Sequence, residues 1–173
     1  MESSSQGYSL KVLDKTESQG ETSYDTKTGF IAISFMSTAN FVLEVTHAGQ
    51  FETGDLAFSK INGMSALQDL KDEVDAYKAQ FAFDPSSVSG LTSTSSATSF
   101  EGITSEWVQG FANATGVKIY ALGSTANTGL HPVKINSSKA ELVKAYPLEN
   151  MLRLLPNDYT TKTKSTDILF KGQ

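Results

Sequence analysis

Apolar and polar residues alternate along much of the N-terminal third of the chain, as they do in β-strands. Every second residue of 8–12 is apolar, and the run over 30–36 is apolar enough to lie buried on both faces of a sheet. A second alternating stretch over 41–47 and an interrupted one over 51–58 predict two more strands. Because the connections between these runs are short, we expect antiparallel hairpins.

The pattern changes to that of an amphipathic helix in the middle of the chain. Apolar residues recur at steps of three and four between 64 and 82, and the pair Asp84-Pro85 predicts the end of this helix. The acidic residues of the segment fall largely outside the apolar stripe, which predicts that they form a solvated face. They are Asp69, Asp72, Glu73 and Asp75.

The second half of the chain carries shorter predicted elements. Helices are expected over 104–116, with Thr104 as the N-cap, and over 138–155, where the first residues have capping-box spacing. Short strands are expected over 117–122 and 166–170. Together these patterns predict an α+β fold, in which a mainly antiparallel sheet from the N-terminal third and the C-terminal strand carries about three helices.

A length of 173 residues predicts a single domain over 1–173. The polar residues of about 1–7 are expected to form a flexible N-terminal arm. Ser and Thr occupy ten of the fourteen positions of 86–99, which predicts a mobile loop that contributes little to the core. A domain boundary at this loop is the alternative, but neither half of the chain carries a complete pattern of its own.

The composition excludes several classes of function. The chain has no cysteine, which removes disulfides, thiolate nucleophiles and cysteine-ligated zinc or iron–sulfur centres. A net charge of −5 argues against a nucleic-acid partner. Only 19% of the residues are charged, whereas 40 of 173 are Ser or Thr, so the surface is expected to be neutral and easily desolvated. Such a surface favours self-association, although a stable extracellular or periplasmic domain has the same composition.

Targeting signals are not apparent in the sequence. The first seven residues lack the basic and apolar regions of a signal peptide, and no apolar run approaches the roughly 20 residues that span a bilayer. We therefore expect synthesis in the cytoplasm and no membrane span. A place in an assembled particle is compatible with this expectation.

The two histidines, His47 and His131, are the first places to look for chemistry. On the predicted strand, Glu44 would lie on the opposite face from His47, so the two are not expected to cooperate. Neither histidine has a partner at metal-ligand spacing, which predicts no metal and no cofactor. No Gly-x-Ser-x-Gly motif is present, and no catalytic residue is assigned.

These observations favour a non-enzymatic structural or assembly subunit of a homo-oligomer, of the virion, tail, tube or filament type. Its expected partner is itself or another protein. The first alternative is a binding module for a small molecule, a glycan or a partner protein. In that module exposed Trp107, Tyr120 or Tyr159 would recognise the ligand, although the helix pattern around Trp107 also fits a core position. The second alternative is an enzyme whose site surrounds His131 in its glycine-bounded loop.

Overall fold

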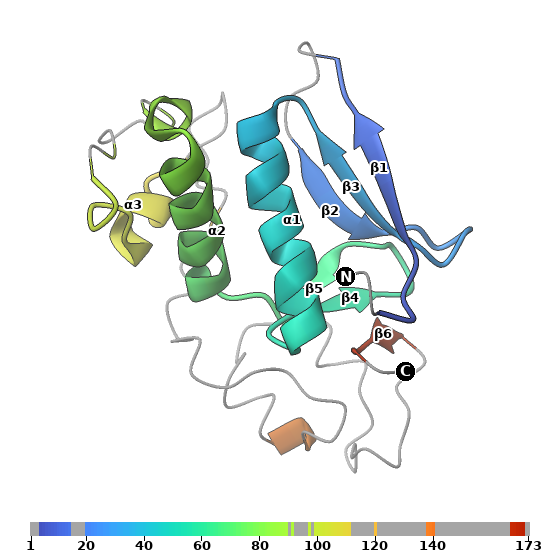
Figure 1. Ribbon diagram of the computed structural model, residues 1–173. Coiled ribbons are helices and arrows are strands. Elements are labelled where there is room, and N and C mark those ends of the chain that lie inside the picture. The colour runs from blue at the N-terminus through green and yellow to red at the C-terminus, as the bar shows by residue number, and fades with distance from the viewer. Residues whose placement is uncertain are drawn as a thin grey trace.

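The computed structural model describes residues 4–14, 20–89, 91, 97, 99–111, 120, 138–140 and 167–171, and the structural statements below concern these residues. They form an α+β fold with two three-stranded sheets, which confirms the predicted fold class. Helix α1 lies between the first sheet and α2, and α3 packs on the far side of α2 (Figure 1). Three of the four strand pairings are antiparallel, as predicted, but the strands form two sheets instead of one.

The first sheet has the strand order β1-β3-β2. Strands β1 (Tyr8–Val12) and β3 (Ile31–Phe35) agree with the alternating and apolar patterns of the sequence. The expected hairpin geometry holds for β2 (Glu21–Tyr24) and β3, but β1 runs parallel to β3, so the hairpin prediction is wrong there. The alternating pattern did not reveal β2, a short polar strand that lies between β1 and β3 in the sequence. Because β2 is the antiparallel neighbour of β3, the chain enters β3 in the same direction as β1.

The strand predicted over 41–47 is wrong, because this segment belongs to helix α1 (Thr38–Thr53). The strand predicted over 51–58 is confirmed only at residues 57–58, which are in β4, because its first residues complete the helix. The Ser37 side chain caps the helix by accepting a hydrogen bond from the Asn40 amide at 3.1 Å. Gly54, with φ of 85°, ends it in the left-handed conformation. The helix buries a stripe at three- to five-residue steps, which includes Ala39, Leu43, Ala48 and Phe51.

The second sheet has β4 (Ala57–Ser59) at its centre, flanked by β5 (Ser65–Ala66) and β6 (Ile168–Leu169). The predicted C-terminal strand is therefore confirmed in a shorter form. The two sheets are joined where the Tyr24 amide donates to the Gly63 carbonyl at 2.7 Å. One core cluster, which lies between α1 and the two sheets, contains Ile31, Phe51, Leu56, Phe58 and Leu169.

Helix α2 (Leu70–Phe83) confirms the predicted amphipathic helix but starts later than residue 64. The helix starts later because residues 65–66 belong to strand β5. Asp69 then caps the helix by accepting hydrogen bonds from the amides of Lys71 and Asp72. Helix α3 (Ser105–Gln109) begins at the predicted cap, Thr104, and ends at Gly110 instead of residue 116.

The Ser/Thr-rich stretch contributes more to the core than its composition predicts. A 3-10 helix, η1 (Pro85–Val88), follows α2, and both Val88 and Ala97 are buried. They join the second core cluster, which also contains Leu70, Val74, Ile103, Trp107, Val108 and Phe111. Residues 90, 92–96 and 98 lie outside the described residues, so the mobility of this loop stays a prediction.

Several other predicted segments lie wholly or partly outside the described residues. This applies to residues 1–3 of the N-terminal arm, the strand over 117–122 apart from Tyr120, and the helix over 138–155 apart from its first turn. The described part of the arm is attached, because the Gln6 side chain donates to the Gly29 carbonyl at 2.7 Å. None of the helices in the described ranges has the length and apolar character needed to cross a bilayer.

The junction between the sheets gives a first prediction. A Cβ added at Gly63 would lie 2.3 Å from the Tyr24 carbonyl oxygen, and φ at Gly63 is +79°. We expect Gly63→Ala to lower the free energy of unfolding by about 1 to 3 kcal/mol, because the junction must shift and the backbone is strained.

Gly49 supplies the matched control, since it lies inside α1 and an added Cβ would meet nothing within 4 Å. Gly49→Ala should raise the free energy of unfolding by roughly 0.5 to 1 kcal/mol, because alanine favours the helix. Urea unfolding of the two variants measures both values. Similar shifts in the same direction would contradict the packing described at Gly63.

Candidate functional site

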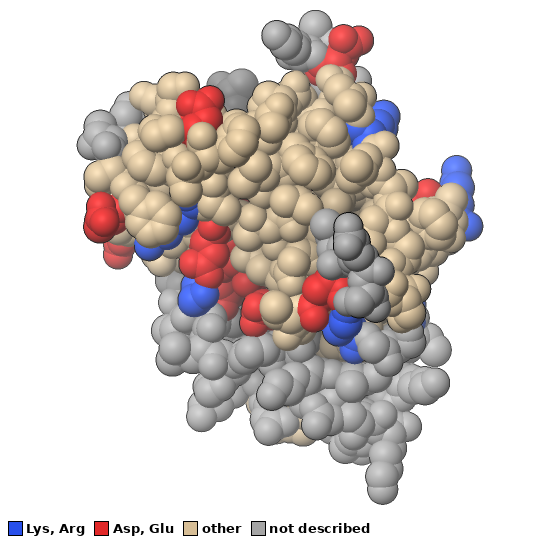
Figure 2. Space-filling view, viewed as in Figure 1, with Lys and Arg blue, Asp and Glu red and all other residues tan. Residues whose placement is uncertain are grey.

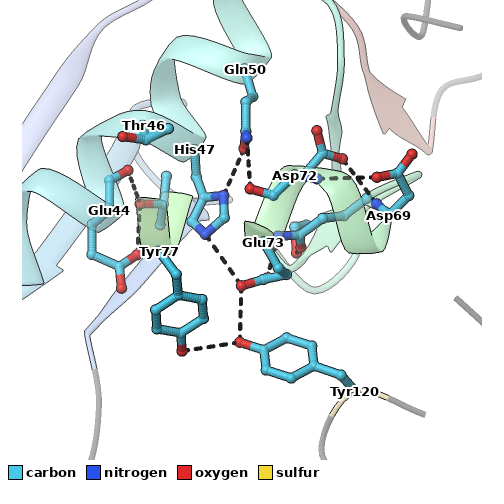
Figure 3. Close-up of polar contacts among 12 residues, drawn as sticks. Glu44, Thr46, His47, Gln50, Asp69, Asp72, Glu73, Tyr77 and Tyr120 are labelled. Carbon is cyan, nitrogen blue, oxygen red and sulfur yellow. Dashed lines mark hydrogen bonds and ion pairs between the residues drawn. The ribbon is translucent and has the colours of Figure 1, made fainter. Parts of the chain in front are cut away.

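The facing sides of α1 and α2 carry an unusual set of buried polar side chains (Figure 3). Glu44 is 4% exposed, and His47 and Glu73 are each 8% exposed. Burial of such groups is unfavourable unless they find partners, so their hydrogen bonds need to be accounted for. Helix α1 contributes Glu44, His47 and Gln50, and α2 contributes Asp72, Glu73 and Tyr77.

This arrangement corrects two predictions from the sequence. Glu44 and His47 do not lie on opposite faces, because in a helix residues three apart share one face. The acidic residues of α2 do not all form a solvated face. Asp69, Asp72 and Glu73 are buried, and of the predicted set only the Asp75 side chain, 43% exposed, meets solvent freely.

The ring of His47 is held in one orientation by Gln50. The Gln50 side-chain amide donates to the Asp72 carbonyl at 2.8 Å, so its Oε1 atom is left to face His47 Nδ1 at 2.7 Å. An amide oxygen can only accept, and therefore His47 Nδ1 carries a hydrogen. The other ring nitrogen, Nε2, lies 3.8 Å from Oε2 of Glu73. The imidazole and this carboxyl group therefore face each other across the α1–α2 contact.

Glu73 is the centre of the network. Its Oε1 atom accepts a hydrogen bond from the Gln68 amide at 2.6 Å, and its Oε2 atom accepts one from the Tyr120 hydroxyl at 2.9 Å. The Tyr77 hydroxyl lies 3.4 Å from that of Tyr120 and extends the chain. Burial raises the pKa of Glu73, against the opposing effects of His47 and the Tyr120 hydrogen bond. Burial also raises the pKa of both tyrosines, so their hydroxyls remain hydrogen-bond donors.

Glu44 is the second buried carboxyl group. The Thr22 hydroxyl lies 3.0 Å from its Oε2 atom, and the Asn40 amide donates to Oε1 at 3.3 Å. Burial raises the pKa of Glu44, and nearby His47 opposes that shift. Gly20 closes over this end, since a Cβ there would lie 2.8 Å from Glu44 Oε1 and 2.3 Å from Asn40 Oδ1. The chain before β2 therefore packs directly on the carboxyl group.

A partly open cavity of about 580 Å³ borders the network. Glu44, His47, Glu73, Tyr77 and Tyr120 all contribute to its wall. The rest of the described lining combines apolar and aromatic groups such as Leu43, Phe58 and Phe111 with hydroxyl and amide groups and with the exposed carboxylate Glu21. None of the described lining residues is Lys or Arg. In the described part of its wall, the cavity therefore presents two buried carboxyl groups, and His47 is the basic side chain beside them.

The aromatic residues considered for recognition lie in different places. Trp107 is 4% exposed and packs edge-on against Tyr77 and Phe111 in the core, with ring centroids 5.3 and 5.0 Å away. Tyr120 contributes its hydroxyl to the network. His131 and Tyr159 lie outside the described residues, so an enzyme site around His131 stays a prediction.

The sequence contains a signal for this site that the strand interpretation concealed. On a helix, Glu44-x-x-His47-x-x-Gln50 places three polar groups on one face, as does Glu73-x-x-x-Tyr77. Chemically, the network can hold and transfer a proton, and its carboxyl groups can bind a cation. In the described ranges, no group of three or more His, Cys, Asp and Glu side chains is placed to hold a metal ion. No protein-family model, curated protein or solved structure matches this chain.

Proposed function

We propose that this protein is a binding module for a small organic cation, whose charged group contacts Glu44 and Glu73 in the cavity. One observation carries the proposal. Two buried carboxyl groups line the same cavity, and the described part of its wall contains no Lys or Arg to neutralise them. Burial leaves an ionised carboxylate poorly solvated, which favours the pairing of each group with a cationic ligand.

The size and the lining of the cavity favour an organic ligand over a metal ion. A volume of about 580 Å³ falls within the roughly 300 to 1,000 Å³ typical of small-molecule sites. Phe58 and Phe111 can cover a hydrocarbon body, while Glu44 and Glu73 face its charged end. The proposed ligand therefore has an ammonium group attached to an apolar portion.

Isothermal titration calorimetry with four probes of similar size tests this function. The probes are butylammonium, choline, butanol and butyrate. We expect the two cations to bind and the alcohol and the anion not to bind. Because burial raises the pKa of Glu44 and Glu73, cation binding should release protons, and its measured enthalpy should depend on the ionisation enthalpy of the buffer.

The variants Glu44→Gln and Glu73→Gln keep the size of each side chain and remove its charge. Each should weaken binding of the cations at least tenfold, whereas Asp75→Asn, which alters a solvent-exposed carboxylate, should leave it unchanged. Equal affinity for butanol and butylammonium would exclude the proposed function. Unchanged affinity in both glutamine variants would also exclude it.

Self-assembly is a second candidate function, and one observation favours it. Leu10 is 63% exposed and Val12 is 72% exposed, and both lie on β1, at an edge of the first sheet. Exposed apolar edge strands are surfaces on which chains associate. This observation is independent of the cavity.

A further inference from the structure

Among the described strands, none pairs with the outer backbone edge of β1. The Ile31 amide donates to the Gly7 carbonyl at 2.9 Å, and the Leu13 amide donates to the Phe35 carbonyl at 2.8 Å. Backbone groups of alternate residues point to opposite sides of a strand, so the odd-numbered residues of β1 face β3. The amide and carbonyl groups of Tyr8, Leu10 and Val12 therefore point away from the sheet, toward the outer side visible in Figure 1.

The opposite edge of this sheet is already occupied. The Tyr24 amide of β2 donates to the Gly63 carbonyl at 2.7 Å, and β2 also contacts β4 and β5 of the second sheet. In the part of the chain that the structure describes, no strand pairs with the outer side of β1. The first sheet can thus be extended at β1.

The side chains of this edge are apolar on the face that carries α1. Leu10 pairs with buried Ile33, and Val12 pairs with Phe35, so both exposed side chains project on the α1 face of the sheet. Phe35 in turn packs against Phe41 of α1, with ring centroids 4.8 Å apart. The middle of the surface over α1 and the adjoining sheet is tan, and the charged side chains of this view lie at its margins (Figure 2). Edge strands that must stay unpaired usually carry charges or proline on such a face.

We propose that two copies of this chain pair antiparallel through β1, across a two-fold axis at Leu10. In this register Leu10 faces its own counterpart, Tyr8 faces Val12, and Ser9 faces Lys11. All of the outward backbone groups of the strand are then used. The only charged residue of the strand, Lys11, meets a serine, whereas a register centred on residue 11 would place two lysines opposite each other.

The choice of a second copy as the partner follows from this self-complementarity. A two-fold axis requires the same patch on both molecules and an antiparallel strand pair, and β1 satisfies both conditions. The two first sheets become one continuous sheet, with both α1 helices on the same face. Leu10 and Val12 of both copies then lie side by side on the face that carries the two helices. This inference rests on the second candidate function and is independent of cation binding.

Sedimentation velocity from micromolar to near-millimolar concentration tests the pairing. The wild-type chain should form dimers as its concentration rises. Leu10→Lys and Leu10→Glu should each remain monomeric, because the two-fold axis places like charges directly opposite each other. An equimolar mixture of the two variants should recover the dimer, because each lysine then faces a glutamate. Ile61→Lys, which alters an apolar residue that is 60% exposed elsewhere, should dimerise like the wild type.

The possible failures have different meanings. A wild-type chain that stays monomeric would overturn both the pairing and the self-assembly function. Association that persists in Leu10→Lys would overturn the β1 interface and leave self-assembly through another surface. A mixture that fails to dimerise, when each variant alone is monomeric and folded by circular dichroism, would overturn the register centred on Leu10. The monomeric variants should still bind butylammonium if the cavity has the proposed function.

Discussion

Glu73→Ala is expected to lower the free energy of unfolding at neutral pH by about 3 to 5 kcal/mol. Glu73 is 8% exposed and accepts hydrogen bonds from the Gln68 amide and the Tyr120 hydroxyl. Truncation would remove the carboxylate that both partly buried donors use as an acceptor and would remove the partner of His47 Nε2. The loss therefore comes mainly from unpaired polar groups, to which the vacated side-chain volume adds.

Glu73→Gln separates this effect from the loss of charge. Glutamine has nearly the same shape and retains an oxygen that can accept the Tyr120 hydrogen bond, so its stability should lie within about 1 kcal/mol of the wild type. Urea unfolding can be followed by fluorescence of Trp107, which is the only tryptophan and packs against Tyr77. Equal losses in the alanine and glutamine variants would contradict the role given to the hydrogen bonds.

The stability of the glutamine variant also shows whether a loss of cation binding comes from the lost charge or from a lost fold. A glutamine variant that folds as stably as the wild type but no longer binds butylammonium has lost a charge and not its structure. The same reasoning applies to Glu44, whose carboxyl group is held by Thr22 and Asn40. Binding and folding can therefore be measured in the same proteins.

The fold class could be predicted from the sequence, but the identity of one central element could not. Residues 41–47 alternate in the manner of a strand, yet Leu43 and His47 are also one helical turn apart and share the buried side of α1. Short apolar stretches fit both periods, and the decision depends on local signals. Here the capping side chain of Ser37 and the left-handed Gly54 favour the helix.

The site was missed for a physical reason that follows from this error. On a strand, Glu44 and His47 point in opposite directions, whereas on α1 they share a face and approach Glu73 of α2. Even with both helices known, periodicity within one segment does not say which helix packs against which. The burial of Asp72 and Glu73 is a consequence of the contact between α1 and α2, and their charge alone favours a solvated face.

Protein stability should fall as the pH rises from about 4 to about 8, and Asp72 should cause much of the change. Burial raises the pKa of Asp72 from 3.8 to about 8, and nearby Asp69, Asp55 and Glu73 act in the same direction. Below the lower value the carboxyl group is protonated in both the folded and the unfolded chain. Between the two values only the unfolded chain releases the proton, which favours unfolding, so stability is lost until the pH passes the folded-state pKa.

Asp72→Asn should abolish this contribution while it preserves the helix cap. Asp72 Oδ2 accepts a hydrogen bond from the Asp69 amide at 2.9 Å, and an asparagine oxygen can replace it. Each tenfold change in proton affinity corresponds to about 1.4 kcal/mol, so the variant should gain on the order of 5 kcal/mol over the wild type near pH 8 and almost nothing near pH 4. Glu44 and Glu73 have raised pKa values and remain in the variant, so some decline with pH should persist.

Asp75→Asn is the matched control, because it removes a carboxylate from the same helix at a solvent-exposed position. Its ion pair with Lys71 is exposed, so the substitution should change stability by less than about 1 kcal/mol at either pH. Urea unfolding of the three proteins at several pH values gives the full comparison. If Asp72→Asn and Asp75→Asn shift the stability curve equally, the buried carboxyl group is not the source of the pH dependence. A wild-type chain that becomes more stable between pH 4 and 8 would show that the exposed acids, whose hydrogen bonds lower the pKa of Asp25 and Glu106, outweigh the buried ones.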